Sequence, residues 1–499
     1  MFFPNDPISI IRCYIGQAIP DAHNIELYTS LRDEVDLQSN VLFTCNVTSY
    51  DEVITRIKVL DKKTYGMVKD VFISKPKFLN FVLHDDVMTD DLHIKWQPVD
   101  QSLIVIDYGG FNIGKRLHRG HLRPLLIGHI LQRLLLYRGY KVNSDIHLGD
   151  YGLPFAMIDY ELARHGHSQA KDIDDLHNLY VQCAQKSKED EHYRATISEH
   201  MTSLLSRPLD KTWSHIRKMS VDHITEVCHL LQIHFDHWGG ESDAIPYLDT
   251  IRKQTVEDQQ SYGLNIDGDF LLLFRKNGTP LYSATDLGTM YSRSAISCNR
   301  SIYVVDSRQK LHFDRLAQAT KLANLDHQVE FIGFAPVVEE NGEVMATRHS
   351  SSSLLQFLHN AKQGRDHNEF LYCLYYWLLH LDYNTVITPA HLSHILRKKQ
   401  VTILKLARDI EHFLSLKQIN RVTVSDVLSH ADRTISKHLI MFMTTIERAC
   451  TKRSTKTFIN YVVELERLLC KYKIGKIHHK VLLRCQVVIK EINIVMGLV

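Results

Sequence analysis

The stretch from Ile106 to Asp150 holds the residues whose types and spacing could do phosphate chemistry. An apolar run, Leu103 to Ile106, predicts a buried strand, and helical periodicity begins at about His121. The loop between strand and helix holds small and cationic residues: Gly114, Lys115, His118, Gly120 and His121. Backbone N–H groups at a helix start and cationic side chains together bind phosphate groups. A nucleotide triphosphate is therefore the expected ligand.

A second strand around Lys141-Val142 leads to a loop that could serve the same ligand. In this loop Gly149 and Gly152 lie on either side of Asp150 and Tyr151. Glycines just past a strand end allow an adenosine to approach the backbone closely, while a carboxylate accepts from a hydroxyl or amine. As an isolated pattern this is only weakly specific.

The composition bounds the class of protein. The 499 residues are 44% hydrophobic and 23% charged, which suits a soluble chain of two to four domains. No apolar run approaches the ~18–20 residues of a membrane span, and no basic region precedes the first apolar residues, as a signal peptide would require. The nine cysteines show no CxxC spacing, and no HExxH occurs. We therefore expect a reducing cytoplasm, no disulfide framework and no structural zinc.

The charge is unevenly distributed. Residues 391–499 hold 20 Lys/Arg against 8 Asp/Glu, a local excess of +12, although the whole chain has a formal charge of only +2. Such a basic segment favours a polyanionic partner such as nucleic acid. A solvated helical face is the alternative interpretation.

The remaining segments predict the elements that must position these loops. Residues 1–95 read as a small α/β appendage, and residues 157–234 as an inserted helical segment. Further strands are expected at Phe270–Phe274 and Ser301–Asp306, with a helix beginning at Leu281–Asp286 between them. From Glu369 onward the pattern is helical, with apolar spacing in Leu392–Ala407, Lys437–Arg448, Thr457–Tyr472 and Lys480–Val495.

Five motifs together resemble a known family. DYGGFNIGKRLHRGHLR, at 107–123, is similar to the ATP-binding signature of class I aminoacyl-tRNA synthetases and, more narrowly, of arginyl-tRNA synthetases. Four further stretches resemble motifs of the same family in the same order: HLGDYG at 147–152, GGES at 239–242, GTPLYSATDL at 278–287 and IYVVDSRQKLHF at 302–313. Any one motif is weak alone, but five in order cover roughly Leu103 to Ser350.

The resemblance implies a bipartite ATP site. His118 and His121 would bind and stabilise the phosphates, and Gly120 would let adenine approach. The second half is expected at 344–350, where Arg348 is the only fixed cation; Lys115 takes the place of the lysine that this loop lacks. The other residues implied in ATP binding are Gly114, Gly149, Asp150, Gly152, His312, Met345 and Thr347.

The resemblance also implies an arginine site. A planar, permanently charged guanidinium is best met by paired carboxylates and a flat aromatic ring, and Glu241, Asp286 and Tyr282 supply them. Asn112 and Gln309 would hold the amino and carboxylate end of arginine, and Asp107 would assist. The alternative is that Tyr282 and Asp286 only cap and pack a helix start.

The implied fold is α/β: a class I synthetase nucleotide-binding, Rossmann-like parallel-sheet domain with a small α/β N-terminal domain and an all-α C-terminal bundle. The expected domains are a tRNA-contacting appendage at 1–95, a catalytic domain at 96–365 with its helical insertion around 160–234, and an anticodon-binding domain at 366–499. The implied protein is a monomeric, cytoplasmic arginine–tRNA ligase using ATP with Mg²⁺, arginine and tRNA(Arg). No tightly bound cofactor, protein-bound metal or membrane partner is expected.

Three departures from the family pattern motivate an alternative. Arg119 stands where a small apolar residue is usual, Pro154 replaces a polar residue, and Ser350 replaces a glycine. Arg119 could add a phosphate contact or obstruct ATP. The alternative is a paralogue that binds tRNA without charging it, or that transfers arginine to another acceptor. A purely structural nucleic-acid-binding protein would explain the basic end but leaves Glu241, Tyr282 and Asp286 without a purpose.

Overall fold

The computed structural model describes residues 6–30, 32–92, 94–165, 170–204, 209–258, 261–266, 268–345, 353–395, 402–420 and 428–498. The chain forms two compact units. Unit 1 combines residues 1–98 with 399–499, and unit 2 is residues 99–398. The boundary at 398 lies beyond the predicted catalytic domain end at 365, while the division into functional domains stays a prediction. No helix in the described part of the chain combines the length and apolar character that a membrane span needs.

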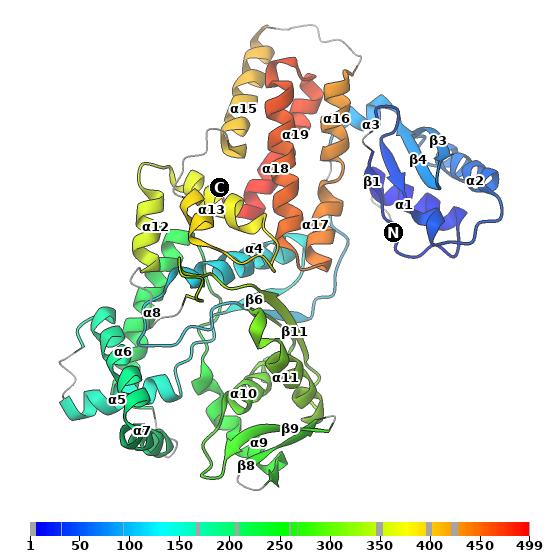
Figure 1. Cartoon of the computed structure of the whole chain (residues 1–499). Helices are drawn as coiled ribbons and strands as arrows, with labels where there is room; N and C mark the ends of the chain where they lie inside the picture. Colours follow the sequence, from blue (N-terminus) through cyan, green and yellow to red (C-terminus); the bar gives the residue numbers. More distant parts are fainter. Residues whose placement is uncertain are drawn as a thin grey trace. The chain divides into compact units, whose positions relative to one another are not determined.

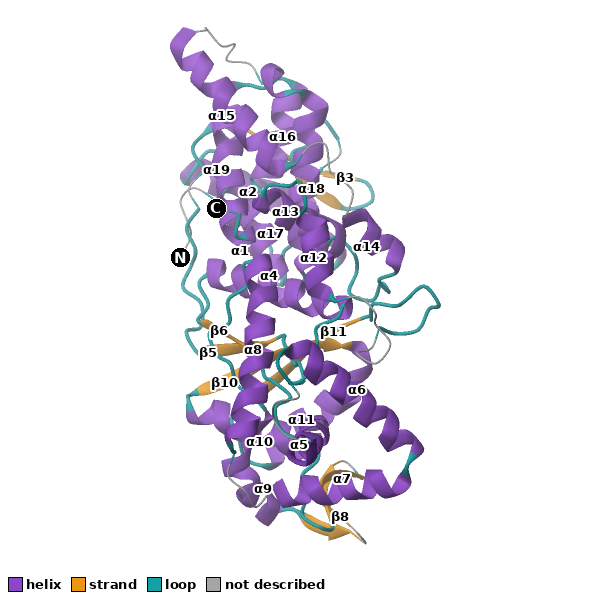
Figure 2. Cartoon of the chain, turned by 90° about the vertical axis from the view of Figure 1, so that its left-hand side faces the viewer, coloured by secondary structure: helices purple, strands orange, loops and turns teal. Residues whose placement is uncertain are grey.

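Unit 2 is built on a four-stranded parallel sheet in the order β11-β10-β5-β6. Its strands are β5 (Leu103–Asp107), β6 (Val142–Asp145), β10 (Cys298–Asp306) and β11 (Gln328–Phe334). Every residue of β5 is buried, as expected for a central parallel strand. Helix α4 (Leu122–Arg138) covers one face, while α10 (Tyr282–Ala295) and α11 (Lys310–Leu322) lie on the other (Figure 2). The predicted parallel α/β sheet is confirmed.

Helix α4 begins and ends as its sequence requires. Pro124 lies in the first turn, where its missing N–H has no intrahelical acceptor to lose. The helix ends at Gly139, whose φ of 104° is the left-handed conformation that glycine adopts without a Cβ clash. The strand and helix predicted around the phosphate loop are therefore confirmed, and their ends place that loop at the carboxyl end of β5.

The rest of unit 2 surrounds this sheet. The helices after β6 are α5 (Leu153–His165), α6 (Ile173–Glu189), α7 (Glu191–Leu204), α8 (Lys211–Leu231) and α9 (Leu248–Gln254). A three-stranded antiparallel sheet follows, with β7 (Val256–Asp258), β8 (Ser261–Ile266) and β9 (Asp269–Arg275). The unit ends with α12 (Leu354–Lys362), α13 (His367–Leu379) and α14 (Pro389–Ile395). Short 3-10 helices lie at Arg119–His121 (η2), Glu241–Tyr247 (η4) and Ser307–Gln309 (η5).

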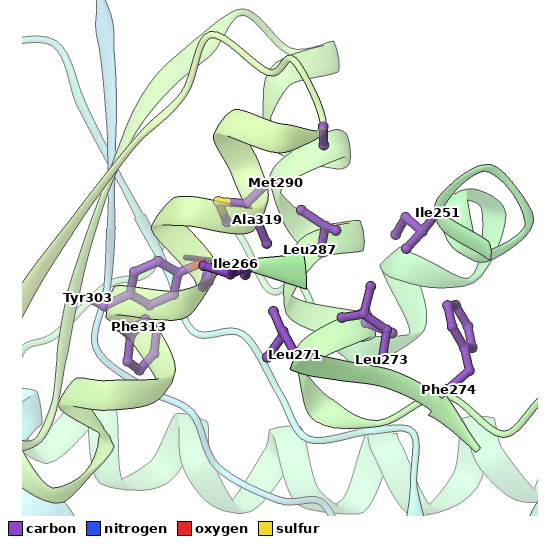
Figure 3. Packing of buried hydrophobic residues seen from close by; sticks show 13 residues of the cluster. Ile251, Ile266, Leu271, Leu273, Phe274, Leu287, Met290, Tyr303, Phe313 and Ala319 are labelled. Atoms are coloured by element: carbon purple, nitrogen blue, oxygen red, sulfur yellow. The ribbon is translucent and has the colours of Figure 1, made fainter. Parts of the chain in front are cut away.

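A hydrophobic core fixes α10 against its neighbours. Leu287 and Met290 of α10 are fully buried with Phe313 and Ala319 of α11 and Leu273 of β9 in one cluster (Figure 3). Burial of side chains of this size contributes about 1.5–3 kcal/mol each to folding. The position of α10, whose first turns carry Tyr282 and Asp286, is therefore set by packing on several elements.

Unit 1 joins the two ends of the chain. The N-terminal part has an antiparallel sheet in the order β1-β2-β4-β3 with three α-helices and a 3-10 turn. Its elements are α1 (Pro7–Ala18), β1 (Tyr28–Thr29), β2 (Leu37–Ser39), η1 (Val41–Phe43), α2 (Tyr50–Lys63), β3 (Val68–Ser74), β4 (Phe78–Leu83) and α3 (Asp85–Thr89). The C-terminal helices are α15 (Ile403–Asn420), α16 (His430–Leu439), α17 (Phe442–Thr451), α18 (Thr455–Tyr472) and α19 (His479–Met496), with η6 (Ile474–Lys476) before α19 (Figure 1).

The two parts of unit 1 meet through charged groups. Arg433 of α16 donates to Asp36 (Nε to Oδ1, 2.8 Å) and to the carbonyl of Leu83 (2.7 Å). Lys437 donates to the carbonyl of Val35 at 2.6 Å. The sequence did not indicate that these distant segments pair. The single helix predicted at 437–448 is also wrong: the chain breaks at residues 440–441, where unbroken burial of apolar residues hides the change of direction from a periodicity argument.

Candidate active site

The loop after β5 is held against the loop after β6. Asn112 and Gly149 form an isolated parallel bridge, and the N–H of Gly149 donates to the carbonyl of Phe111 at 2.8 Å. A Cβ at Gly149 would come within 2.5 Å of the Asn112 side-chain oxygen. The structure therefore brings these two predicted residues together, and glycine is needed at 149 for that close approach.

His118 and His121 form a stacked pair whose ring orientation is fixed by the backbone. Their ring centroids lie 3.8 Å apart. Nδ1 of His118 accepts from the N–H of Gly120, and Nδ1 of His121 accepts from the N–H of His118, both at 3.1 Å. Because Nδ1 is the acceptor in each neutral ring, the proton is on Nε2. Each histidine thus presents an N–H donor from its other edge.

Both rings are neutral near pH 7. Burial, then the neighbouring His177 and Lys115, lower the pKa of His118 to about 4. Burial, then His118 and Lys115, lower the pKa of His121 well below its usual value. The pair therefore supplies hydrogen-bond donors without formal charge. Such donors suit oxygen atoms on which charge develops during a reaction.

Two glycines shape the loop. A Cβ at Gly120 would meet the His118 ring at 2.8 Å, so residue 120 must lack a side chain for His118 to fold over its N–H. Gly114 has a φ of +71°, and its N–H donates to Ser220 Oγ at 2.8 Å. The Gly114 N–H is therefore used internally, and a role in ATP binding remains a prediction.

Lys115 interacts electrostatically with the histidine pair and with Glu241. Its Nζ is 3.9 Å from the ring centroid of Tyr180 on α6. After burial, its positive charge is one of the causes that lower the pKa values of His118 and His121. The same charge offsets part of the rise in the pKa of Glu241 that burial causes. Because charge effects fall with distance, Lys115 is close to both groups.

Described residues on either side of 346–352 lie close to the histidine loop. Met345, which is buried, has its Cβ 3.7 Å from the position of a Cβ at Gly120. Ser353 pairs with His118 in an antiparallel bridge, and the N–H of Leu354 donates to the carbonyl of Leu117 at 2.9 Å. Met345 on one side of 346–352, and Ser353 and Leu354 on the other, therefore lie next to the loop that carries His118 and His121. Thr347, Arg348 and Ser350 lie outside the described residues.

The structure accommodates both Arg119 and Pro154 at their positions. The Arg119 guanidinium carbon lies 5.2 Å from the ring centroid of Phe357 on α12. Arg119 also lines a cavity of about 270 Å³ with residues of α12 and α14. Pro154 is the second residue of α5, a first-turn position that tolerates proline.

Glu241, Tyr282 and Asp286 form one electrostatic cluster. Burial first, then Asp286, raise the pKa of Glu241 well above its usual value. Although 59% of Tyr282 is exposed, partial burial and then Glu241, Tyr180 and Asp286 raise its pKa to about 12. Among the described residues, no lysine or arginine forms an ion pair with Glu241. Two carboxylates and a tyrosine hydroxyl thus interact electrostatically, and such a combination of groups favours a cation.

His312 on α11 is in contact with Asp286, and Gln309 lies in the 3-10 helix just before α11. His312 Nε2 is 2.5 Å from Asp286 Oδ2, and this contact, acting against burial of the ring, raises the pKa of His312. His312 therefore contacts the arginine-site cluster, whereas it was predicted in the ATP site. Gln309 is exposed at the carboxyl end of β10, three residues before His312.

Asp150 holds the loop that carries Glu241. Its carboxylate is fully buried and accepts from the N–H and hydroxyl of Ser242, both at 2.9 Å, and from Arg217 Nε at 3.2 Å. These protein donors hold the Asp150 carboxylate, and its predicted role in ATP binding stays a prediction. Gly152 lies beside the same loop: a Cβ there would be 3.4 Å from Glu241 Oε2.

Asp107 is engaged by a buried arginine. Arg293 Nη2 donates to Asp107 Oδ2 and to Asp145 Oδ2, each at 2.7 Å. Asp107, Asp145 and His147 are close enough to hold a metal ion, but the Arg293 guanidinium already pairs with both carboxylates. This group is therefore a salt-bridge cluster, and the predicted contact between Asp107 and arginine remains untested.

Comparison with known proteins decides the family. Residues 84–368 match the family of "tRNA synthetases class I (R), catalytic domain", which is more than half of the chain. The chain belongs to this family.

Curated arginine–tRNA ligases are similar to this class I synthetase chain over part of their length. The ligase of Alkaliphilus oremlandii is 30% identical over 385 residues, 69% of this chain and 64% of that protein. The ligase of Francisella tularensis subsp. novicida is 28% identical over 322 residues, 56% of this chain and 55% of that protein. The match thus spans less than two thirds of these relatives.

Two solved structures share the fold of this synthetase chain. The arginyl-tRNA synthetase of Thermus thermophilus has a TM-score of 0.78 at 15% identity, covering 98% of this chain and 99% of that one. The enzyme of Plasmodium falciparum has a TM-score of 0.74 at 17% identity, covering 98% and 96%. The predicted fold class is confirmed.

Sequence reasoning missed the residues that hold this synthetase site together. Arg293, Asp145, Ser242 and Arg217 are all buried or half-buried partners of site loops. Ser242 belongs to the GGES motif, and Arg293 follows Asp286 by seven residues and so lies on the same face of α10, but neither pattern indicated their hydrogen-bond partners.

Proposed function

We propose that the chain is an arginine–tRNA ligase, which activates L-arginine with ATP and transfers it to the 3′-terminal ribose of tRNA(Arg). The observation that carries this proposal is the cluster of Glu241, Asp286 and Tyr282 near Lys115, which in turn lies close to the paired neutral histidines. The proposal thus depends on an amino-acid site and a phosphate site joined in one place.

The carboxylate cluster suits a guanidinium in particular. Burial leaves the carboxyl of Glu241 with a strongly raised pKa, and a bound cation would relieve the repulsion from Asp286. A planar guanidinium can donate to both carboxylates at once and lie against the Tyr282 ring, whereas a lysine ammonium is a single point charge. The site therefore favours arginine. Asn112 and Gln309, with Asp107 assisting, would hold the amino and carboxylate end.

Activation requires no side-chain nucleophile. The arginine carboxylate attacks the α-phosphorus of ATP, a carboxylate–phosphate bond forms, and the bond to pyrophosphate breaks with both electrons leaving on pyrophosphate. The Nε2–H groups of His118 and His121 would donate to phosphate oxygens as charge builds up on them. Lys115 and Arg348 would add positive charge, and Mg²⁺ would enter with ATP as part of the substrate.

Transfer follows on the same surface. The 2′-hydroxyl of the terminal ribose attacks the arginyl carbonyl and AMP leaves. We assign residues 1–95 and 366–499 to tRNA contact, with the basic 391–499 segment supplying phosphate contacts. The proposed protein acts as a cytoplasmic monomer without a tightly bound cofactor.

ATP–pyrophosphate exchange tests the proposal. Folded protein is incubated with ATP, Mg²⁺, labelled pyrophosphate and tRNA(Arg), with arginine or lysine as the amino acid. We expect label in ATP with arginine and at least 100-fold less with lysine. Absence of exchange, with circular dichroism showing a folded protein, would overturn the proposal.

A further inference from the structure

We propose that Arg293 is a positioning residue for arginine recognition, fixing the geometry between α10 and the loop that carries Glu241. The inference rests on the proposed function for the identity of the ligand. Its structural basis is independent, because it comes from one buried guanidinium and its four hydrogen bonds.

Arg293 lies on the face of α10 that carries the predicted arginine contacts. The helix begins at Tyr282, and Asp286 and Arg293 follow by four and eleven residues. At 3.6 residues per turn, the three side chains fall within about 40° of one another around the helix axis. Arg293 is roughly 10 Å farther along the helix than Asp286, so it does not touch the same ligand atoms.

The Arg293 guanidinium connects α10 to the parallel sheet through hydrogen bonds. Nη1 donates to Ser301 Oγ at 3.1 Å and to the Tyr303 hydroxyl at 2.9 Å, both on β10. Nη2 donates to Asp107 at the end of β5 and to Asp145 at the end of β6, each at 2.7 Å. One side chain on α10 therefore contacts three adjacent strands of the parallel sheet.

Asp145 extends this connection to the loop of Glu241. Its Oδ1 accepts from the N–H of Gly239 and from His237 Nδ1, each at 3.3 Å. The N–H of Leu148 donates to the carbonyl of Gly239 at 2.8 Å, and the N–H of Glu241 to that of Leu148 at 2.9 Å. A short hydrogen-bonded ladder thus runs from Asp145 to Glu241.

The connection between Arg293 and the strands depends on the charge of the guanidinium and on its planar shape. Arg293 is 4% exposed, so its charge is desolvated and must be matched by Asp107 and Asp145. A lysine could keep one ion pair, but its single ammonium cannot reproduce the planar, four-bond arrangement. Glu241 and Asp286 come from separate segments, so the spacing of their carboxylates depends on how α10 is held against the Glu241 loop. The Arg293 link acts there beside the close packing of Gly288 on Ala244, whereas the histidine pair is held by its own backbone contacts.

The test compares Arg293→Lys and Arg293→Met with Arg484→Lys in the full-length chain. Arg484 is also 4% exposed, so its side chain does not belong to the surface assigned to tRNA; it lies in unit 1 and donates to the carbonyl of Val87 at 3.0 Å. For each protein, exchange kinetics give separate KM values for arginine and ATP, and thermal melting reports stability.

We expect Arg293→Lys to raise the arginine KM about tenfold and Arg293→Met to raise it further, with the ATP KM within twofold of wild type. Arg484→Lys should leave both KM values unchanged even if its melting temperature falls. An unchanged arginine KM in both Arg293 variants, or an equal rise in the ATP KM, would overturn the inference and leave the proposed function intact. Folded wild-type protein without arginine-dependent exchange overturns the proposed function, and with it the ligand assigned here.

Discussion

Nδ1 of His118 accepts a hydrogen bond from the N–H of Gly120 at 3.1 Å, which leaves Nε2–H free to donate outward. A Cβ at residue 120 would lie 2.8 Å from this ring. We therefore expect Gly120→Ala to displace His118 and slow arginine-dependent exchange about 100-fold, the usual effect of losing one donor to a charged transition state. Exchange kinetics measure this. Gly110→Ala is the control, because a Cβ there meets nothing within 4 Å; equal activity of the two variants would contradict the prediction.

The raised pKa of Glu241 predicts how arginine binding depends on pH. Below that pKa the free carboxyl is protonated, and a guanidinium prefers the carboxylate, so binding releases a proton. The arginine KM should fall as the pH rises toward the raised pKa, by at most about tenfold per pH unit. In Glu241→Gln the KM should be higher and its pH slope lost. A slope that persists in this variant would assign the titration to another group.

We expect the carboxylate of Asp286 to increase the affinity for arginine. Asp286→Asn removes one carboxylate from the guanidinium site, and hydrogen bonds to charged groups contribute about 1.5–3 kcal/mol, so the arginine KM should rise roughly 10- to 150-fold. The ATP KM should stay within twofold of wild type. Asp314→Asn changes an exposed carboxylate on α11 and should leave the arginine KM unaltered. An unaltered KM in Asp286→Asn would mean that Asp286 does not bind arginine and serves only its contact with His312 on α11.

Lys115 should be needed for activation. The described part of the second loop supplies no fixed cation, and Lys115 is near both histidines. We expect Lys115→Ala to lower the rate of tRNA charging at least tenfold. Lys218→Ala removes an exposed lysine that pairs with Asp222 on α8 and serves as the control. Full activity of Lys115→Ala would remove this lysine from the proposed mechanism.

Arg433 should stabilise unit 1. Asp36 is 1% exposed, so Arg433→Met leaves a buried carboxylate without its main partner and should cost about 3–5 kcal/mol. Arg467→Met breaks a surface pair with Glu464 on α18 and should cost at most about 1 kcal/mol. Urea unfolding of the two variants measures the difference. Equal losses would mean that the Asp36 contact contributes no more than a surface pair.

The parts of the site that follow from local chemistry were predictable. The strand at Leu103 depends on an apolar run, and the helix after His121 depends on a periodicity, so both follow from local sequence. Glu241, Tyr282 and Asp286 were singled out by family motifs, and the structure places them in one electrostatic cluster.

The parts that depend on long-range pairing were not predictable. The sequence did not predict that the Asp150 carboxylate accepts hydrogen bonds from Ser242 and Arg217, which lie far along the chain. The Arg119 guanidinium lies over the ring of Phe357, a contact between distant segments that no local sequence pattern predicts. Likewise, a buried arginine such as Arg293 looks like any helix residue until its acidic partners are known. These contacts arise only when separate segments fold together.

Charging of tRNA(Arg) tests the central claim most directly. Wild type and Glu241→Gln are incubated with ATP, Mg²⁺, tRNA(Arg) and labelled arginine or, in a parallel reaction, labelled lysine, and acid-precipitable label is counted. The account predicts ester-linked arginine on the tRNA with wild type, no lysine incorporation, and a large loss of charging in Glu241→Gln. Folded wild-type protein that leaves the tRNA uncharged, or a Glu241→Gln variant that charges it as well as wild type, would contradict the account.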